Sequence, residues 1–133
     1  MVEVINTSGK RKESIARAVV KKGSGKLRIN NVPIEVFVPE IARFKIMEPM
    51  TLAGDKVENV DINVNVQGGG YMGQAEASRT AIAKGLVAFL QDEELEHIFK
   101  QYDRSLLISD SRRKLPKRPQ GRGARKKRQK SYR

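Results

Sequence analysis

The distribution of charge divides this chain into two unequal parts. The 133 residues contain 27 Lys and Arg and 15 Asp and Glu, which gives a formal net charge of +12 at pH 7. Residues 1–110 hold 15 basic and 15 acidic side chains, so their charges cancel. Residues 111–133 hold 12 basic residues and no acid. The sequence therefore predicts one folded domain over residues 1–110 and a cationic tail over residues 111–133.

The tail is not expected to fold alone, because its cations repel one another and its apolar residues are only Leu115, Ala124 and Tyr132. Its prolines and glycines also resist helix formation. Such a segment stays disordered in water and orders against a polyanion. It lacks the apolar face of a membrane-bound amphipathic helix, so no membrane partner is expected. Nuclear targeting is a weaker interpretation of the same basic run.

Several classes of protein are excluded or disfavoured by composition. The absence of cysteine excludes a disulfide framework, a Cys-based zinc finger and a thiol nucleophile. The single histidine, His97, argues against a His-rich metal site and is expected on the surface. The longest apolar run, residues 86–90, is far shorter than the roughly 20 residues that span a bilayer. No signal peptide is expected. The sequence thus predicts no catalytic residue, no metal and no cofactor.

Hydropathy patterns in residues 1–110 predict an α+β fold. The predicted strands cover residues 2–5, 14–22, 26–30 and 59–67, and the predicted helices cover residues 39–48 and 73–90, with a short third helix after Asp92. The polar residues 7–12 are interpreted as a loop, and the strands on either side of the turn at 23–25 as a β-hairpin. In the first helix, Ile41, Phe44 and Met47 have helical spacing, with Ile46 as a further candidate for the same pattern.

A glycine cluster lies between the last predicted strand and the longest helix. Gly68-x-Gly70-x-x-Gly73 matches the dinucleotide-binding pattern, but the repeated βαβ units of that fold are missing. A phosphate-binding loop is also disfavoured, because Gln74 and Ala75 occupy the positions of its lysine and hydroxyl residue. Two interpretations remain: a tight turn with positive φ at one or more glycines, or backbone amides that face an RNA phosphate.

The basic segments favour RNA over duplex DNA. No helix-turn-helix, basic zipper or zinc module is visible. The tail is rich in arginine, which offers forked donors to phosphate and a planar group that stacks on bases. An extended cationic strand of this kind suits the spaces between helices of a folded RNA. Lys10, Arg11 and Lys12 could supply a second contact from the domain.

Ordered motifs along the chain are similar to the signatures of one protein family. They are GKRK at 9–12, GGGYMGQAEASR at 68–79, YDR at 102–104, DSRR at 110–113 and the ending RQKSYR at 128–133. Together they resemble the small-subunit ribosomal protein S-nine family over essentially the whole chain. The Ser-Tyr-Arg ending resembles the archaeal and eukaryotic branch, and the short chain favours an archaeal type.

The resemblance implies a compact four-stranded sheet with helices on one face, similar to the second domain of ribosomal protein S-five, with a left-handed crossover. It implies a monomer in the head of the cytoplasmic small ribosomal subunit, bound to the 3′ major domain of its rRNA. The tail would reach the anticodon stem-loop of peptidyl-site tRNA. Neighbouring head proteins of the S-seven, S-ten and S-fourteen families would be further partners.

Charge and resemblance together select the candidate binding residues. The rRNA-binding candidates are Lys10, Arg11, Lys12, Gly69, Gly70, Arg79, Arg104, Arg112, Arg113, Lys114, Lys117, Arg118, Arg122, Arg125, Lys126, Lys127, Arg128 and Lys130. The tRNA-binding candidates are Ser131, Tyr132 and Arg133. A structural RNA-binding protein of the small subunit is thus the leading hypothesis. The alternatives are a free nucleic-acid chaperone or chromatin-like protein, and a small nucleotide-binding enzyme supported only by the glycine pattern.

Overall fold

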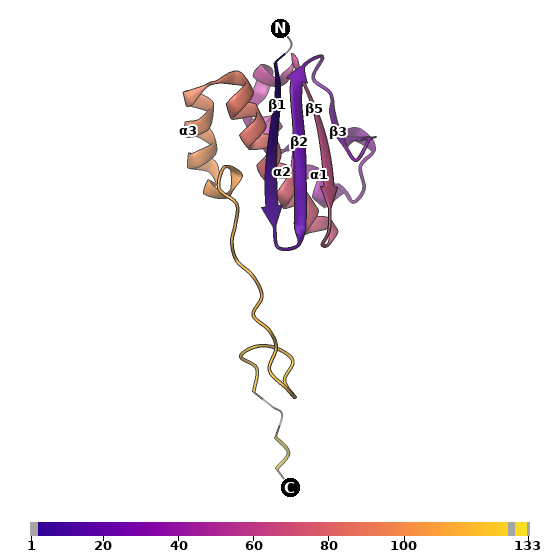
Figure 1. Cartoon of the computed structure of the whole chain (residues 1–133), viewed down its shortest axis with the longest axis vertical. Coiled ribbons are helices and arrows are strands. Elements are labelled where there is room, and N and C mark those ends of the chain that lie inside the picture. Colours follow the sequence, from indigo (N-terminus) through magenta and orange to yellow (C-terminus); the bar gives the residue numbers. More distant parts are fainter. Residues whose placement is uncertain (1–2, 128–129, 133) are drawn as a thin grey trace.

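A computed structural model describes residues 3–127 and 130–132 and shows an α+β body from which the tail extends (Figure 1). The predicted α+β class is confirmed. The strands are β1 (Val4–Arg11), β2 (Ser14–Lys22), β3 (Leu27–Ile29), β4 (Val32–Pro33) and β5 (Val60–Gln67). The helices are α1 (Glu40–Ala53), α2 (Tyr71–Leu90) and α3 (Glu93–Tyr102), joined by short 3-10 turns.

The strands form one sheet in the order β1-β2-β5-β3-β4, with five strands instead of the four expected. The extra strand is the two-residue β4. The predicted hairpin between β2 and β3 is wrong, because β5 lies between them and pairs antiparallel with β2 and parallel with β3. Alternation is strictest in β5, and its four apolar residues are all buried, which explains its interior position in the sheet. The expected left-handedness of the β3–α1–β5 crossover stays a prediction.

The predicted loop at residues 7–12 is also wrong, because β1 pairs with β2 along its whole length from Val4 to Arg11. Its sequence is polar because one side of the strand faces solvent and the other lies against α2. At Gly9 an added Cβ would lie 2.2 Å from the carbonyl oxygen of Ala77 in α2. Only glycine permits β1 and α2 to come this close at position 9. The inward side of β1 therefore lacks the regular apolar residues by which a strand is recognised in a sequence.

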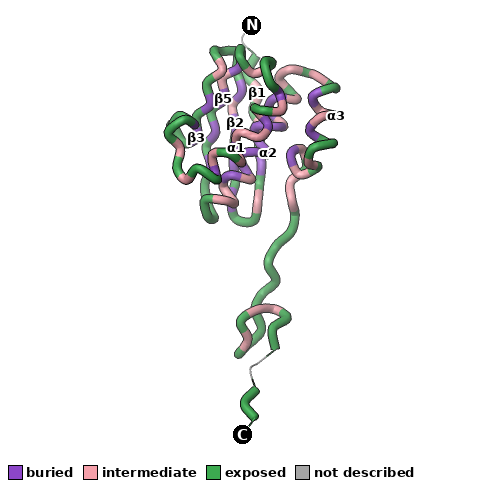
Figure 2. The backbone as a smooth tube through the Cα atoms, turned by 180° about the vertical axis from the view of Figure 1, so that it is seen from behind, coloured by how far each residue is buried: buried purple, intermediate pink, exposed green. Residues whose placement is uncertain are grey.

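The core lies between the inner face of the sheet and the three helices (Figure 2). Helix α2 packs along β1 and β2, and its small residues Ala77, Ala81 and Gly85 permit a close approach to the sheet. Helix α1 differs in part from the expectation. Ile41 and Phe44 are 69% and 59% exposed, whereas the further candidate Ile46 is buried, together with Ala42, Pro49 and Ala53. The helix continues through Pro49 instead of ending before it, because that turn packs into the core.

Candidate nucleic-acid interface

One end of the body gathers three segments that are far apart in the sequence. The β1–β2 turn, the glycine turn after β5 and the start of the tail meet there, at the end from which the tail leaves (Figure 1). Arg11, Lys12, Gly69, Gly70 and Tyr71 line one groove at this end. The structure therefore brings together candidates that the sequence assigned to two separate motifs.

The glycine turn has the geometry that the sequence predicted. Gly68 and Gly69 have φ of +80° and +66°, a region that L-residues with side chains rarely adopt. Added Cβ atoms there would lie 2.4 Å from the carbonyl oxygen of Glu13 and 2.3 Å from Ser14 Oγ, respectively. Ser14 Oγ donates a hydrogen bond to the carbonyl of Gly68 at 2.8 Å, which holds the turn against the start of β2.

Gly70 plays a different part in the same turn. Its φ is −92°, and an added Cβ would have no heavy atom within 4 Å. It is the N-cap of α2, and no side chain accepts a hydrogen bond from the first backbone amides of the helix. Those amides lie at the positive end of the helix dipole, beside Arg11 and Lys12. The arrangement agrees with both interpretations of the glycine cluster, a tight turn and an amide surface for an anion.

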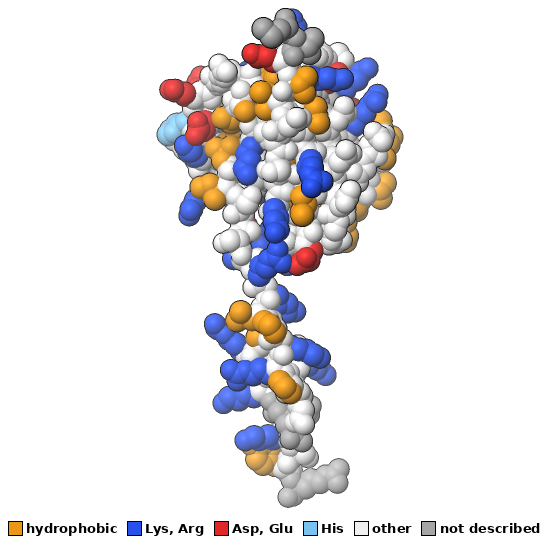
Figure 3. Space-filling model, viewed as in Figure 1, with side chains coloured by type: hydrophobic (Ala, Val, Ile, Leu, Met, Phe, Trp, Pro, Cys, Tyr) orange, Lys and Arg blue, Asp and Glu red, His pale blue; other side chains and the backbone are white. Residues whose placement is uncertain are grey.

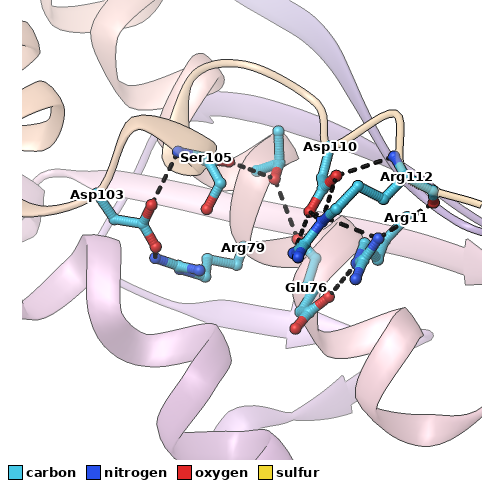
Figure 4. Close-up of polar contacts among 8 residues, drawn as sticks. Arg11, Glu76, Arg79, Asp103, Ser105, Asp110 and Arg112 are labelled. Atoms are coloured by element: carbon cyan, nitrogen blue, oxygen red, sulfur yellow. Dashed lines mark hydrogen bonds and ion pairs between the residues drawn. The ribbon is translucent and has the colours of Figure 1, made fainter.

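An ion-pair network fixes the start of the tail to the body (Figure 4). Arg11 and Asp110 form an isolated parallel β-bridge, and their side chains approach to 3.5 Å. Arg11 Nε also pairs with Glu76 of α2 at 2.6 Å, and Arg112 pairs with Asp110 at 2.6 Å. Hydrogen bonds from the side chain and backbone N–H of Arg112 lower the pKa of Asp110 to about 2, so this carboxylate is ionised at neutral pH.

Arg113 extends the attachment to the β1–β2 turn. Its guanidinium pairs with Glu13 and donates to the carbonyl oxygen of Lys12 at 3.1 Å. Glu13, Glu76 and Asp110 were not among the candidate binding residues. No periodic pattern relates these acids to the tail, since each is paired only by the tertiary structure. They attach the tail by its first two cations, Arg112 and Arg113.

Arg79 lies in the interior, although the sequence placed it among the rRNA-binding candidates. It is 4% exposed, and its guanidinium pairs with Asp103 at 2.6 Å. Its Nε lies 2.7 Å from Glu48 Oε2 but does not point at it, so the two groups form an ion pair without a hydrogen bond. Burial raises the pKa of Asp103, but hydrogen bonds from Arg79 and Ser105 outweigh it and bring the pKa to about 2. This position favours a structural role that joins α1, α2 and the segment after α3.

The rest of the tail is open to solvent. Beyond Arg113 the described residues form no helix or strand and no ion pair with the body. The exposed basic side chains are Lys114, Lys117, Arg118, Arg122, Arg125, Lys126, Lys127 and Lys130. Arg104 is exposed where the chain leaves α3, and Ser131 and Tyr132 are exposed near the tip. Arg128 and Arg133 lie outside the described residues.

The described residues show no alternative site of another chemistry. Within residues 3–127 and 130–132, no three His, Cys, Asp or Glu side chains are placed to hold a metal ion. None of the described helices is long and apolar enough to cross a membrane. The features that the structure does show are an α+β body, a polar groove and a row of exposed cations. They are the features expected of a protein that binds a polyanion by charge and shape.

Comparison with known proteins identifies the family to which the chain belongs. Residues 9–133 match the family model described as ribosomal protein S9/S16, and the chain belongs to that family. It is 58% identical to small ribosomal subunit protein uS9 of Thermoplasma volcanium over 132 residues, covering 99% of this chain and 100% of that protein. It is 53% identical to the protein of the same name from Picrophilus torridus over 133 residues, covering both completely. The resemblance drawn from the motifs is confirmed, and these relatives are archaeal, which agrees with the expected archaeal type.

Proposed function

We propose that this ribosomal protein is a structural, non-enzymatic constituent of the small ribosomal subunit that binds rRNA in the subunit head. Full-length similarity to proteins named for that subunit supports the assignment. The body would sit on folded rRNA of the 3′ major domain, beside neighbouring head proteins, and the tail would neutralise converging phosphates. Its place would be the cytoplasm, within the subunit and as a single copy.

The observation that best supports this mechanism is that the first two cations of the tail are paired with the body and the later ones are exposed. Arg112 and Arg113 pair with acids of the body, while the exposed cations beyond them have no ion-pair partner among the described residues. A tail that is fixed at its origin and uncompensated along its length is suited to run along an RNA backbone in one direction. The rRNA contacts that we propose therefore come from the tail beyond Arg113, from Lys10, Lys12 and Arg104, and from the amides of Gly69 and Gly70.

Association with the small subunit tests this assignment. The tagged protein is expected to cosediment with small subunits in moderate salt, at one copy per subunit. A free chaperone or chromatin-like protein would bind RNA and DNA of many kinds and would leave the subunit at the same salt, because nonspecific phosphate binding weakens steeply with ionic strength. Cosedimentation that is lost in moderate salt would refute the proposal and support that alternative.

We also propose that the tip of the tail, Ser131, Tyr132 and Arg133, contacts the anticodon stem-loop of peptidyl-site tRNA. The 23 residues from 111 to 133 can extend over roughly 75–80 Å, which lets the tip act far from the body. Arg133 offers a forked donor to one more phosphate.

Deleting Arg133 alone is expected to leave subunit assembly intact and to weaken peptidyl-site tRNA binding by roughly 1–3 kcal/mol, the range for one hydrogen bond to a charged group. The measurement is tRNA dissociation from purified subunits that carry either version at equal protein occupancy. A variant with Lys130→Gln, which removes one charge just before the tip, is the matched control and is expected to change dissociation less. Equal dissociation rates for wild type and the Arg133 deletion would remove the tRNA role from this residue.

A further inference from the structure

The face of the sheet opposite the helices is open, and its charge differs from that of the helical layer. Side chains alternate along each strand, so every second residue points outward. The register places Arg17 beside Asn65 and Arg28 beside Asn63, all exposed on this outer face. The outward cations are Lys10, Arg17, Lys21 and Arg28.

Acidic side chains are almost absent from the sheet. Asp61 is the only acid within the five strands, which hold six Lys and Arg residues. Its Oδ1 accepts hydrogen bonds from the backbone N–H groups of Ser24 and Lys26 at 2.8 and 3.0 Å, at the end of the sheet far from the tail. Figure 3 shows this face with basic side chains spread across it and acidic ones at its margins.

The cations of the two layers also differ in their partners. Of the four outward cations of the sheet, none forms an ion pair with a described residue. Four cations of the helices and one of the 3-10 turn after α1 do form ion pairs. These five are Arg43, Lys45, Lys56, Arg79 and Lys100. The charges of residues 1–110 cancel in total but are separated in space. The outer face of the sheet carries four cations and one acid, Asp61, which lies opposite Lys21, so the face is positive in net charge. The other acids of residues 3–110 lie outside the five strands.

The polar side chains between these cations indicate which kind of polyanion the outer face of the sheet can bind. Between the cations lie the amides of Asn63, Asn65 and Gln67, which can both donate and accept hydrogen bonds. The strands contribute no aromatic residue on which an unpaired base could stack. Arg17 and Lys21 are four residues apart on one strand, a distance of about 13 Å. Fixed cations with intervening amides match the phosphates and 2′-hydroxyls of base-paired RNA, which proteins recognise by shape.

We propose that the outer face of β1, β2, β5 and β3 is a second RNA-binding surface, which takes a base-paired segment of RNA through Arg17, Lys21 and Arg28. The proposal rests on the proposed rRNA-binding function and adds a surface independent of the tail. The outward amides contact the sugar edges of the same segment. The body is then held to RNA by its own sheet as well as by the tail.

The test is the full-length triple variant Arg17→Gln, Lys21→Gln and Arg28→Gln, bound to a small-subunit rRNA fragment over a range of salt. Losing about three phosphate contacts is expected to flatten the slope of log K against log[salt] by about 2–3 and to weaken binding about 100-fold at 0.1 M salt. The control carries Arg43→Gln, Lys56→Gln and Lys100→Gln, which removes the same charge from the helical layer. It is expected to keep most of the wild-type slope. Thermal unfolding of both variants checks that each remains folded.

A photo-crosslinking side chain at position 65 identifies what covers the face in assembled subunits. A crosslink to RNA is expected, whereas a crosslink only to a neighbouring protein would overturn the proposal. An unchanged salt slope in the sheet variant would also overturn it, as would equal losses in the sheet and control variants. Failure of the proposed function is a distinct result, because the wild-type chain itself would then fail to bind rRNA.

Discussion

Deleting residues 114–133 is expected to flatten the salt dependence of rRNA binding strongly. The deletion leaves Arg112 and Arg113, and with them the ion pairs that attach the tail. It therefore removes cations that, among the described residues, form no ion pair with the body, and it does not disturb the body. With roughly six to ten phosphate contacts, wild-type affinity should fall by about three to five decades from low to moderate salt. The truncated protein should lose most of that slope, measured as log K against log[salt].

The longer deletion of residues 111–133 is the matched comparison. It should affect rRNA binding to nearly the same extent, because Arg112 and Arg113 are already engaged by Asp110 and Glu13. It should also lower the thermal stability of the body slightly, since exposed ion pairs contribute little. If the salt slope is the same for wild type and both deletions, the tail is not the electrostatic anchor.

Gly68→Ala is expected to destabilise the body by about 2–4 kcal/mol. The methyl group would meet the carbonyl oxygen of Glu13 at 2.4 Å, and an L-residue at φ of +80° adds about 1–2 kcal/mol of backbone strain. The β1–β2 turn and the start of α2 would have to move apart. Chemical denaturation, compared at a constant m-value, measures the loss of stability.

Gly70→Ala is the control two residues along the same turn. Its φ of −92° suits alanine, and the added Cβ would meet open space, so stability should change by only about 0.5 kcal/mol. Comparable losses at both positions would contradict the explanation from φ and close contact. Weaker rRNA binding by a stable Gly70→Ala protein would instead indicate that a Cβ at this position obstructs an RNA contact near the helix amides.

Local patterns in the sequence were sufficient for several elements. The predicted strand at 14–22 agrees with β2, and the predicted strand at 59–67 agrees with β5 to within one residue. The helix predicted over 73–90 begins two residues earlier, at Tyr71. The short helix after Asp92 is also present, with the Asp92 side chain accepting hydrogen bonds from Glu94 and Leu95. In each case the signal is a period of 2 or 3.6 residues or a capping residue, which depends only on neighbours along the chain.

Helix α1 shows where a local pattern misleads. Ile41 and Phe44 have the spacing of a buried face, yet the core takes Ala42 and Ile46 from the adjacent face. Both faces of that helix carry apolar residues at helical spacing. Helix α1 packs against α2 and α3, and this tertiary contact selects the face with Ala42 and Ile46 for the core.

The sequence by itself determined the charged tail, the main helices and strands, the glycine turn and, through its motifs, the family. Tertiary structure alone decided that β5 separates β2 from β3, that Arg79 is buried against Glu48 and Asp103, and that the acids of the body hold the tail at Arg112 and Arg113. It also decided that a body with no net charge presents a positive sheet face. Net charge is a sum along the chain, whereas binding depends on which charges share a surface, and pairing between distant strands and helices sets that arrangement.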